Sequence, residues 1–205
     1  RGKAMEFTTD DLKALFVAFA TRMAAERDHL CALDGAIGDG DHGIAMEQGM
    51  AAAAKAAAET TGTLQDICNA AAKAFLNAIG ASSGPLYATG LLRVGKALGP
   101  MTSVPRSQIL QIIPAIRDGI SQRGKAEPGQ KTMLDTWHAA AEAVLSGSTA
   151  PDVAAAARRG AASTENMVAR MGRAERLQER SIGHPDPGAV SASMLVEEIA
   201  AVFRN

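Results

Sequence analysis

The chain has 205 residues, with 21 basic and 22 acidic side chains, so its formal net charge is −1. This balance excludes the strongly basic surface that drives non-specific binding to nucleic acid or to an anionic membrane. Hydrophobic residues make up 47% of the chain but aromatic residues only 3%. Because strand-favouring residues are scarce and alanine, the best helix former, is abundant, the composition predicts an all-α fold.

Cysteine usage and the absence of targeting patterns indicate a cytoplasmic protein. Cys31 and Cys68 lie in apolar helical contexts, which is typical of reduced thiols that pack in a cytosolic core. No apolar run reaches the length of a membrane span, and no charged-then-apolar signal opens the sequence. Residues 1–4 precede a native start at Met5 and are expected to be an expression remnant, so a single domain is expected over residues 5–205.

Apolar residues recur at helical spacing through most of the chain. A cap with acidic residues in the first turn, at Thr8–Asp11, opens the first helix. A long loop is expected over residues 172–188, where glycines and prolines gather. The eight expected helices cover approximately residues 10–30, 42–59, 63–79, 86–98, 105–123, 133–145, 151–171 and 189–203.

Eight helices with mostly short connections favour an antiparallel up-and-down bundle. In such a bundle, every connection from an odd to an even helix lies at the same end. Four unusual loops make these connections: an acidic loop at 33–43, a Gly-Ser loop at 80–85, a loop at 123–129 and the long loop at 172–188. The topology therefore predicts that the four loops meet at one end and form a single site.

The acidic loop carries three carboxylates within eight residues. Asp34, Asp39 and Asp41 are separated by glycines and apolar residues, and His42 follows directly. Carboxylates this close repel one another, and a hard cation with oxygen ligands removes that cost. An EF-hand is excluded, because the twelfth position counted from Asp39 is Met50, where a bidentate glutamate is required. The loop favours a Mg²⁺ and phosphate site, and aspartates that only cap the second helix are the alternative.

Two helix starts in these loops suit a phosphate. The first, at His42, offers backbone N–H groups and the positive end of a helix dipole, so His42 either donates to a phosphate oxygen or only caps the helix. The second, at Gly80–Gly84, offers two hydroxyls and unhindered amides. It is not a Walker A motif, because no Gly-Lys-Ser/Thr follows, and a plain turn between helices is the alternative. Arg173 and Arg180 flank the long loop and are candidates to meet phosphates.

Taken together, these loops resemble the nucleotide-binding L subunit of dihydroxyacetone kinases, the DhaL family, which also occurs as the C-terminal domain of single-chain ATP-dependent kinases. Four blocks carry the likeness, in the family's order and spacing and over nearly the whole chain. They are Leu33–Asp34 with Ile37–Gly43; Ser83–Tyr87; Arg123–Gly129 with Lys131–Met133; and Gly172–Ala174 with Glu179–His184 and Asp186–Ala189. The resemblance implies a closed barrel of eight antiparallel helices with a nucleotide site at one end.

The resemblance also implies a set of ligands. Two Mg²⁺ ions would be held by Asp34, Asp39 and Asp41, beside ADP or ATP. Phosphoryl transfer in this setting depends on positioning and charge neutralisation. The implied nucleotide contacts are His42, Gly43, Ile44 and Ala45 at a helix start, Ser82 and Ser83 at the phosphates, Gly124 and Met133 around adenine and ribose, and Arg173, Asp186, Pro187 and Gly188 over the nucleotide.

The implied activity is that of one subunit of a glycerone-kinase-type phosphotransferase, as in glycerol metabolism. In the family the ketose is held covalently on a partner K subunit, so the chain is expected to be half an enzyme, and a homodimer is one arrangement. The donor is either exchangeable ATP or a phosphohistidine protein of the phosphotransferase system that rephosphorylates bound ADP. The alternatives are a kinase subunit for another short ketose such as a tetrulose, a non-catalytic interaction module that retains the ADP site, and a structural protein that binds only Mg²⁺ or Ca²⁺.

The long loop departs from the family pattern. Family members commonly read Ala-Ser-Tyr-Leu-Gly-Glu-Arg-Ser, where this chain reads Ala-Glu-Arg-Leu-Gln-Glu-Arg-Ser at 174–181. Glu175, Arg176 and Gln178 thus replace a small residue, an aromatic residue and a glycine. A second difference is Ala81–Ser82, where the family often has Gly-Ala. Because neither difference removes a metal ligand, nucleotide binding is expected to survive, with a different loop conformation or partner.

Overall fold

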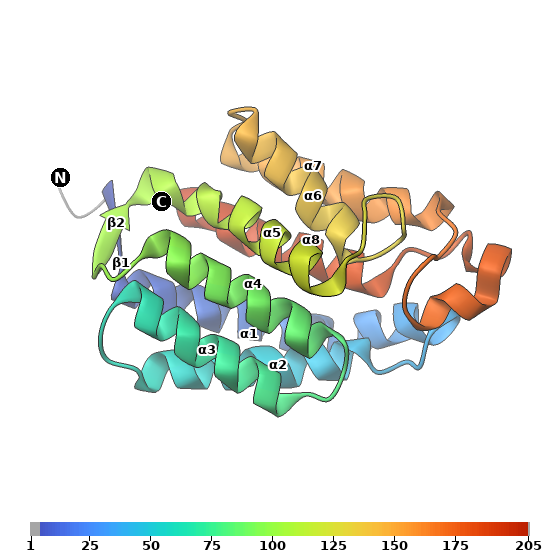
Figure 1. The fold of residues 1–205 in the computed structure, drawn as a ribbon, viewed down its shortest axis with the longest axis horizontal. Helices are drawn as coiled ribbons and strands as arrows, with labels where there is room; N and C mark the ends of the chain where they lie inside the picture. The colour runs from blue at the N-terminus through green and yellow to red at the C-terminus, as the bar shows by residue number, and fades with distance from the viewer. Residues whose placement is uncertain (1–4, 205) are drawn as a thin grey trace.

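A computed structural model describes residues 5–204 of the chain, and Figure 1 shows its helices lying lengthwise beside one another. The all-α expectation is confirmed for this part of the chain. Residues 1–4, expected to be an expression remnant, lie outside the described residues. The α-helices are α1 Thr9–Ile37, α2 His42–Glu59, α3 Leu64–Ala78, α4 Ser83–Leu98, α5 Ile112–Gly124, α6 Met133–Leu145, α7 Ala150–Ser163 and α8 Pro187–Ala201.

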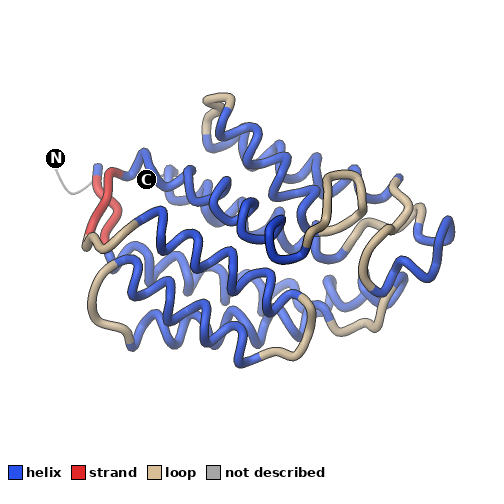
Figure 2. Tube along the Cα trace, in the orientation of Figure 1, coloured by secondary structure: helices blue, strands red, loops and turns tan. Residues whose placement is uncertain are grey.

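Short elements complete the fold. Strand β1 (Glu6–Thr8) pairs antiparallel with β2 (Ser103–Pro105), with Phe7 opposite Val104. Both of these side chains are buried, so this small sheet, which composition did not predict, covers one end of the core. Figure 2 shows the strands at the end of the molecule far from η4. The 3₁₀ segments are η2 Arg106–Gln111, η3 Thr164–Asn166, η4 Arg173–Ser181 and η5 Val202–Arg204.

Each α-helix packs against the next along the chain, and α8 also packs against α1 and α6. This cycle of neighbours is consistent with the expected closed barrel. Its core holds an aromatic row in which Tyr87 meets Phe75 and Trp137 edge to face, with ring centroids 5.7 and 6.2 Å apart. The Trp137 indole N–H donates to the Tyr87 hydroxyl over 3.2 Å, so the polar atoms of this buried row are paired. Among the described residues, no helix combines the length and hydropathy needed to cross a membrane.

Small residues let α2 approach its neighbours closely. A Cβ atom built at Gly43 would collide with the backbone carbonyl of Arg27 on α1. One built at Gly49 would lie 2.5 Å from the Phe75 ring on α3. Since α2 is held this tightly at both positions, its first residue, His42, is fixed beside the C-terminal part of α1.

Several expected boundaries were wrong. Helix α1 continues to Ile37, beyond the expected end near residue 30, and the added turns bury Ile37; Asp34 lies near the end of this helix, as expected. Helix α7 ends at Ser163 rather than near Met171, because the chain turns into η3 at Thr164. Helix α5 begins only at Ile112, after the 3₁₀ turn η2. The expected long loop contains η4, and α8 begins at Pro187, where Asp186 caps it.

Candidate functional site

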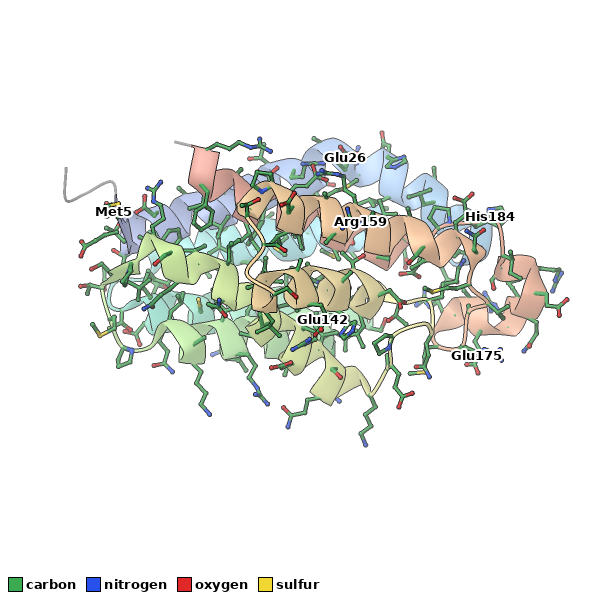
Figure 3. All side chains as sticks on the ribbon, turned by 90° about the horizontal axis from the view of Figure 1, so that it is seen from above. Met5, Glu26, Glu142, Arg159, Glu175 and His184 are labelled. Carbon is green, nitrogen blue, oxygen red and sulfur yellow. The ribbon has the colours of Figure 1, made fainter. Side chains whose placement is uncertain are left out.

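A cavity of about 450 Å³ lies at the end of the bundle where α2, α4, α6 and α8 begin. Figure 1 shows the α1–α2, α3–α4 and α5–α6 connections gathered at this end, together with η4. Figure 3 shows the labelled Glu175 and His184 at this end and Met5 at the opposite one. Residues of all four unusual loops line the cavity, so their expected convergence is confirmed.

Most of the residues proposed from sequence face this cavity. Asp39, Gly43 and Ile44 are not among the residues that line it. Gly43 is instead buried against α1, and Ile44 is 45% exposed. Those that do line it are Asp34, Asp41, His42, Ala45, Ser82, Ser83, Gly124, Met133, Arg173, Asp186, Pro187 and Gly188.

Asp34 reaches from α1 to the start of α2. Its Oδ2 atom accepts hydrogen bonds from the backbone N–H groups of Asp41, over 2.9 Å, and His42, over 3.0 Å. The side chain of Asp41, which occupies the N-cap position itself, makes no capping bond. Asp34 therefore caps α2 from the preceding helix. Capping of the second helix was the alternative considered for the aspartates of this loop.

The other two aspartates face arginines of η4. Arg173 pairs with Asp39, and its Nη1 atom lies 3.6 Å from Asp41 Oδ2. Arg176 Nη2 lies 3.6 Å from Asp39 Oδ1. Within residues 5–204, no three His, Cys, Asp or Glu side chains are grouped so that they could hold a metal ion. One carboxylate is turned to amides and two are turned to guanidinium groups, and their assignment as metal ligands stays a prediction.

His42 is tied to α8 by a hydroxyl. Its Nε2 atom lies 2.7 Å from Ser191 Oγ, and that hydroxyl donates to the Gly188 carbonyl over 3.1 Å. The serine has one proton for these two contacts, so the imidazole tautomer decides whether His42 or Ser191 donates between them. Burial lowers the pKa of His42, although Asp34 and Asp41 act to raise it. Burial thus favours the neutral imidazole, and the Ser191 contact fixes its orientation.

Ser83 is the first residue of α4 and lines the cavity with its polar side chain unpaired. The residue is 4% exposed, and its Oγ atom has no hydrogen-bond partner in the structure. A buried hydroxyl without a partner costs free energy, unless a bound molecule completes it. Ser82, the exposed N-cap residue, makes no side-chain capping bond either. This helix start is open toward the cavity.

The starts of α6 and α8 are closed by their own residues. Thr132 Oγ1 accepts from the Leu134 N–H, and Asp135 returns the bond by accepting from the Thr132 N–H over 2.9 Å. At α8, Asp186 Oδ2 accepts from the Ala189 N–H over 2.8 Å. Burial raises the pKa of Asp186 to about 7, against the lowering effects of the Ala189 N–H and of Lys131. These two starts form walls of the cavity.

Several residues that line the cavity or fix its side chains were not assigned a site role from the sequence. Ile120 has only the spacing of a core residue, whereas Leu86 and Ile37 lie in the resembling blocks but carry no polar group. Ser191, which fixes His42, is one turn beyond the Pro187–Gly188 start of α8, and only its position relative to that motif was a signal. Lys131 belongs to the third resembling block, yet a single lysine in a loop is normally exposed, and here it is 2% exposed.

The departure in the long loop has a backbone counterpart. Gln178 has φ 52° and ψ −130°, a conformation that interrupts η4 and that glycine adopts with least strain. This is the position at which the family commonly has glycine. The neighbouring change to Arg176 supplies the second guanidinium group that faces Asp39. The altered residues therefore belong to the same segment that covers the aspartates.

Comparison with known proteins identifies relatives. The DAK2 domain family model matches residues 36–201. The ADP-binding subunit DhaL of a PEP-dependent dihydroxyacetone kinase from Listeria innocua is 39% identical over 178 residues, which cover 86% of this chain and 88% of that protein. The corresponding Escherichia coli subunit is 37% identical, over 89% of this chain and 91% of its own. An L-erythrulose kinase of Pectobacterium atrosepticum is 31% identical, and the match covers 36% of that protein.

Solved structures show the same fold. The dihydroxyacetone kinase of C. freundii, in its native form, superposes on 93% of this chain with a TM-score of 0.72 and 20% identity. Its complex with AMP-PNP and Mg²⁺ gives a TM-score of 0.71. The chain spans about a third (34%) of that enzyme. With the family model and the DhaL relatives in agreement over most of its length, the chain belongs to the DAK2-domain family that includes the DhaL ADP-binding subunits of dihydroxyacetone kinases.

Proposed function

We propose that the chain is the nucleotide-binding subunit of a dihydroxyacetone kinase. Residues 5–205 would act as one DhaL-type domain that positions ADP or ATP, with two Mg²⁺ ions, for phosphoryl transfer to a ketose held on a K-type partner. The observation that carries this proposal is Ser83, an unpaired, buried hydroxyl on the wall of a cavity built from four helix starts. A phosphate oxygen would supply the partner that this hydroxyl lacks.

The phosphates would lie at the starts of α2 and α4. Two helix N-termini bring N–H groups and positive dipole ends, and Ser82 and Ser83 add hydroxyls. A neutral His42, held by Ser191, keeps its orientation without adding a charge. Arg173 is already at this end of the cavity and can turn from the aspartates to an anionic phosphate chain.

Mg²⁺ would be held by Asp34, Asp39 and Asp41. Their carboxylate oxygens are the donors that a hard cation prefers, and the clustered negative charge is at present offset by Arg173 and Arg176. Such a cation would neutralise charge on the phosphates. The side chains of Asp39 and Asp41 are 43% and 52% exposed, so they can turn toward a cation without unpacking the core.

The base and ribose would occupy the apolar side of the cavity. Met133, Leu86 and Ile120 line this side, beside Gly124. A Cβ atom at Gly188 would lie 3.6 Å from Met133, so the glycine keeps this wall open. An apolar surface next to a polar, anion-binding end matches the two halves of a nucleotide.

The names of three relatives support one mode of phosphoryl donation. Those at 39% and 37% identity are PEP-dependent by name, and one from Lactococcus lactis at 35% is PTS-dependent, whereas an erythrulose kinase is 31% identical. This order favours a retained ADP that a phosphohistidine protein rephosphorylates, and dihydroxyacetone as the ketose. A cytoplasmic location is part of the proposal, since Cys31 and Cys68 are both free thiols.

Calorimetric titration of the nucleotide-free protein with ADP and with ATP tests the proposal, in Mg²⁺ and again in EDTA. We expect Mg²⁺-dependent ADP binding, weakened about ten-fold in Ser83→Ala. Ser146→Ala is the matched control, because Ser146 is the C-cap residue of α6, at the end of this helix away from the cavity. ADP that resists exchange supports the relay mode, and ready exchange to ATP supports an ATP-dependent kinase. No binding of either nucleotide rejects the proposed function.

A further inference from the structure

Lys131 is a buried lysine whose ammonium group is surrounded by backbone carbonyls. The residue is 2% exposed. Its Nζ atom donates to the carbonyl oxygens of Thr164, over 2.6 Å, Ser181, over 2.9 Å, and Met167, over 3.2 Å. The His184 carbonyl is a fourth short contact. One side chain thus takes up carbonyl groups that lie 33 to 53 residues further along the chain.

These carbonyls belong to the two ends of one segment, residues 164–186, which we call the cover segment. Thr164 and Met167 lie where the chain leaves α7, and Ser181 and His184 lie shortly before α8. The lysine therefore joins the beginning of the cover segment to its end. The neighbouring Gln130 adds to this anchor, because its carbonyl accepts from the Arg170 N–H over 3.1 Å.

The cover segment carries two residues that line the cavity, one beside the acidic residues and one at the start of α8. Arg173, near its middle, faces Asp39 and Asp41. Asp186, at its end, caps α8 and lines the cavity. Because Lys131 lies next to the Thr132 cap of α6, it connects the fixed α6 wall to the segment that covers the cavity.

Burying the charged ammonium group of Lys131 costs free energy, because the group loses its hydration. Burial lowers the pKa of Lys131, while Asp186 and Glu165 act to raise it. An apolar side chain of similar length would pack without that cost, but it would offer no donor to the four carbonyls and would not define their directions. Of these carbonyls, that of Thr164 also accepts from the Met167 N–H over 3.2 Å. The charged group instead fixes the positions of four carbonyl groups, and therefore of the cover segment to which they belong.

We propose that Lys131 is a positioning residue: by joining both ends of the cover segment it holds Arg173 and Asp186 at the cavity, and it thereby sets how long a nucleotide stays bound. This inference rests on the proposed function, because the ligand retained is the nucleotide. It predicts that loss of the ammonium group speeds nucleotide release more than it affects the rest of the fold.

Two variants and a matched control separate retention from folding. Lys131→Met keeps the length of the side chain without its charge, and Lys131→Ala leaves room for an added n-propylammonium ion in place of the missing atoms. Lys125→Met is the control, since Lys125 is an exposed lysine with the same left-handed backbone, φ 57° against 64° for Lys131. Ser181→Ala loosens the segment without a buried charge, because Ser181 Oγ bonds the Ala169 N–H and the Gln178 carbonyl.

Release of a fluorescent ADP analogue is followed by stopped flow in Mg²⁺, and backbone hydrogen exchange is followed without nucleotide. We expect release about ten-fold faster in both Lys131 variants and a smaller increase in Ser181→Ala. Exchange should rise over residues 167–184 while the α1–α4 helices stay protected. n-Propylammonium should slow release from Lys131→Ala and leave Lys125→Met unchanged.

The outcomes distinguish the two proposals. If wild type binds the ADP analogue and the Lys131 variants release it at the wild-type rate, the positioning role is wrong, whatever their melting temperatures. Faster release that n-propylammonium does not slow, with exchange raised over the whole chain, also overturns it and indicates a general loss of stability. If wild type binds no nucleotide, the proposed function falls, and the inference falls with it even if exchange shows that Lys131 anchors the segment.

Discussion

Helix starts at the two ends of the bundle can be completed in different ways, as two starts from each end illustrate. At the end that carries the β-strands, α1 and α3 begin with capping boxes, in which Thr8 pairs with Asp11 and Thr63 with Asp66. At the cavity end, α2 and α4 begin without any capping bond from their own N-cap side chains. In α1 and α3 the cap comes from the helix's own residues. At α2 it comes from Asp34 on α1, and at α4 the Ser83 hydroxyl is left unpaired.

The contrast belongs to these four helices and not to the whole ends: α6 and α8 also begin at the cavity end and are capped by Thr132 and Asp186, and α5 and α7 begin at the strand end without a side-chain capping bond. Backbone strain, by comparison, does separate the two ends. The non-glycine residues with positive φ in the described part of the chain are Lys125, Lys131 and Gln178, and all lie in connections at the cavity end. The strained residues thus lie at the same end as the unpaired Ser83, where the proposed function places the nucleotide.

The largest expected effect is on metal-dependent binding. Asp39→Asn should weaken ADP binding in Mg²⁺ by about 100-fold or more, because it removes a charged oxygen donor from the proposed metal site. Calorimetry with and without EDTA measures it. Asp10→Asn, an exposed first-turn aspartate at the strand end, is the control and should bind like wild type. Wild-type affinity in Asp39→Asn would reject the metal assignment.

Next in size is a packing change beside the cavity. Gly43→Ala should lower the free energy of unfolding by about 1–3 kcal/mol, because the new methyl group meets the Arg27 carbonyl. Gly35→Ala is the matched change on α1, where a Cβ atom has nothing within 4 Å, and it should raise stability by about 0.5–1 kcal/mol. Urea unfolding checks both. Equal effects would show that the close α1–α2 approach is not what requires Gly43.

The pH dependence of stability should differ in sign between the two ends. Asp186 has its pKa raised to about 7, so its folded form favours the proton, and its contribution falls as pH rises from its ordinary value of 3.8 toward 7. Asp186→Asn, which can still cap α8, should therefore gain stability over wild type across this range. Thermal unfolding from pH 4 to pH 8 measures the difference, and a constant difference would contradict the buried carboxyl.

Asp66→Asn supplies the opposite case at the strand end. Bonds from the Thr63 backbone and side chain hold the pKa of Asp66 below its ordinary value. Its contribution is therefore present above the ordinary value of 3.8 and is lost as pH falls through the lowered one. The variant should be less stable than wild type at neutral pH, and the two should converge in acid.

A smaller effect compares two caps. Thr63→Ala should cost about 1 kcal/mol of unfolding free energy, because it removes a capping box, whereas Ser82→Ala should cost only a few tenths. The order should reverse for ADP affinity, where only Ser82 lies at the cavity. Denaturant titration and calorimetry on the same two proteins decide. An equal loss of stability would mean that Ser82 forms a cap in solution.

The smallest effect concerns the altered loop. Gln178→Gly should raise the free energy of unfolding by about 1 kcal/mol, because it relieves a side chain at φ 52°. Glu179→Gly, at the next residue, has no such strain to relieve and should be neutral or destabilising. Differential scanning calorimetry resolves the two. Destabilisation by Gln178→Gly would show that the loop is built around the glutamine.

Local patterns were enough to predict the helices and the end at which the site lies. The helical spacing of apolar residues and helix caps such as Thr8–Asp11 involve residues no more than four positions apart, so both can be recognised in the sequence. In an antiparallel bundle of eight helices, the four connections from odd to even helices lie at one end, so their proximity follows from topology alone. Resemblance to the DhaL family added the residues within those loops, of which all but Asp39, Gly43 and Ile44 line the cavity.

Tertiary structure alone decided how these residues are held. Asp34 caps α2 from α1, Ser191 fixes His42 from 149 residues away, and Lys131 collects carbonyls from both ends of the cover segment. The early end of α7 belongs with the last of these, since two of the carbonyls that the lysine binds, those of Thr164 and Met167, lie in the stretch expected to be helical. Sequence determined which groups the chain carries and in what local frame; which of them pair depends on the packing of distant helices, because a hydrogen bond requires contact in space and not proximity along the chain.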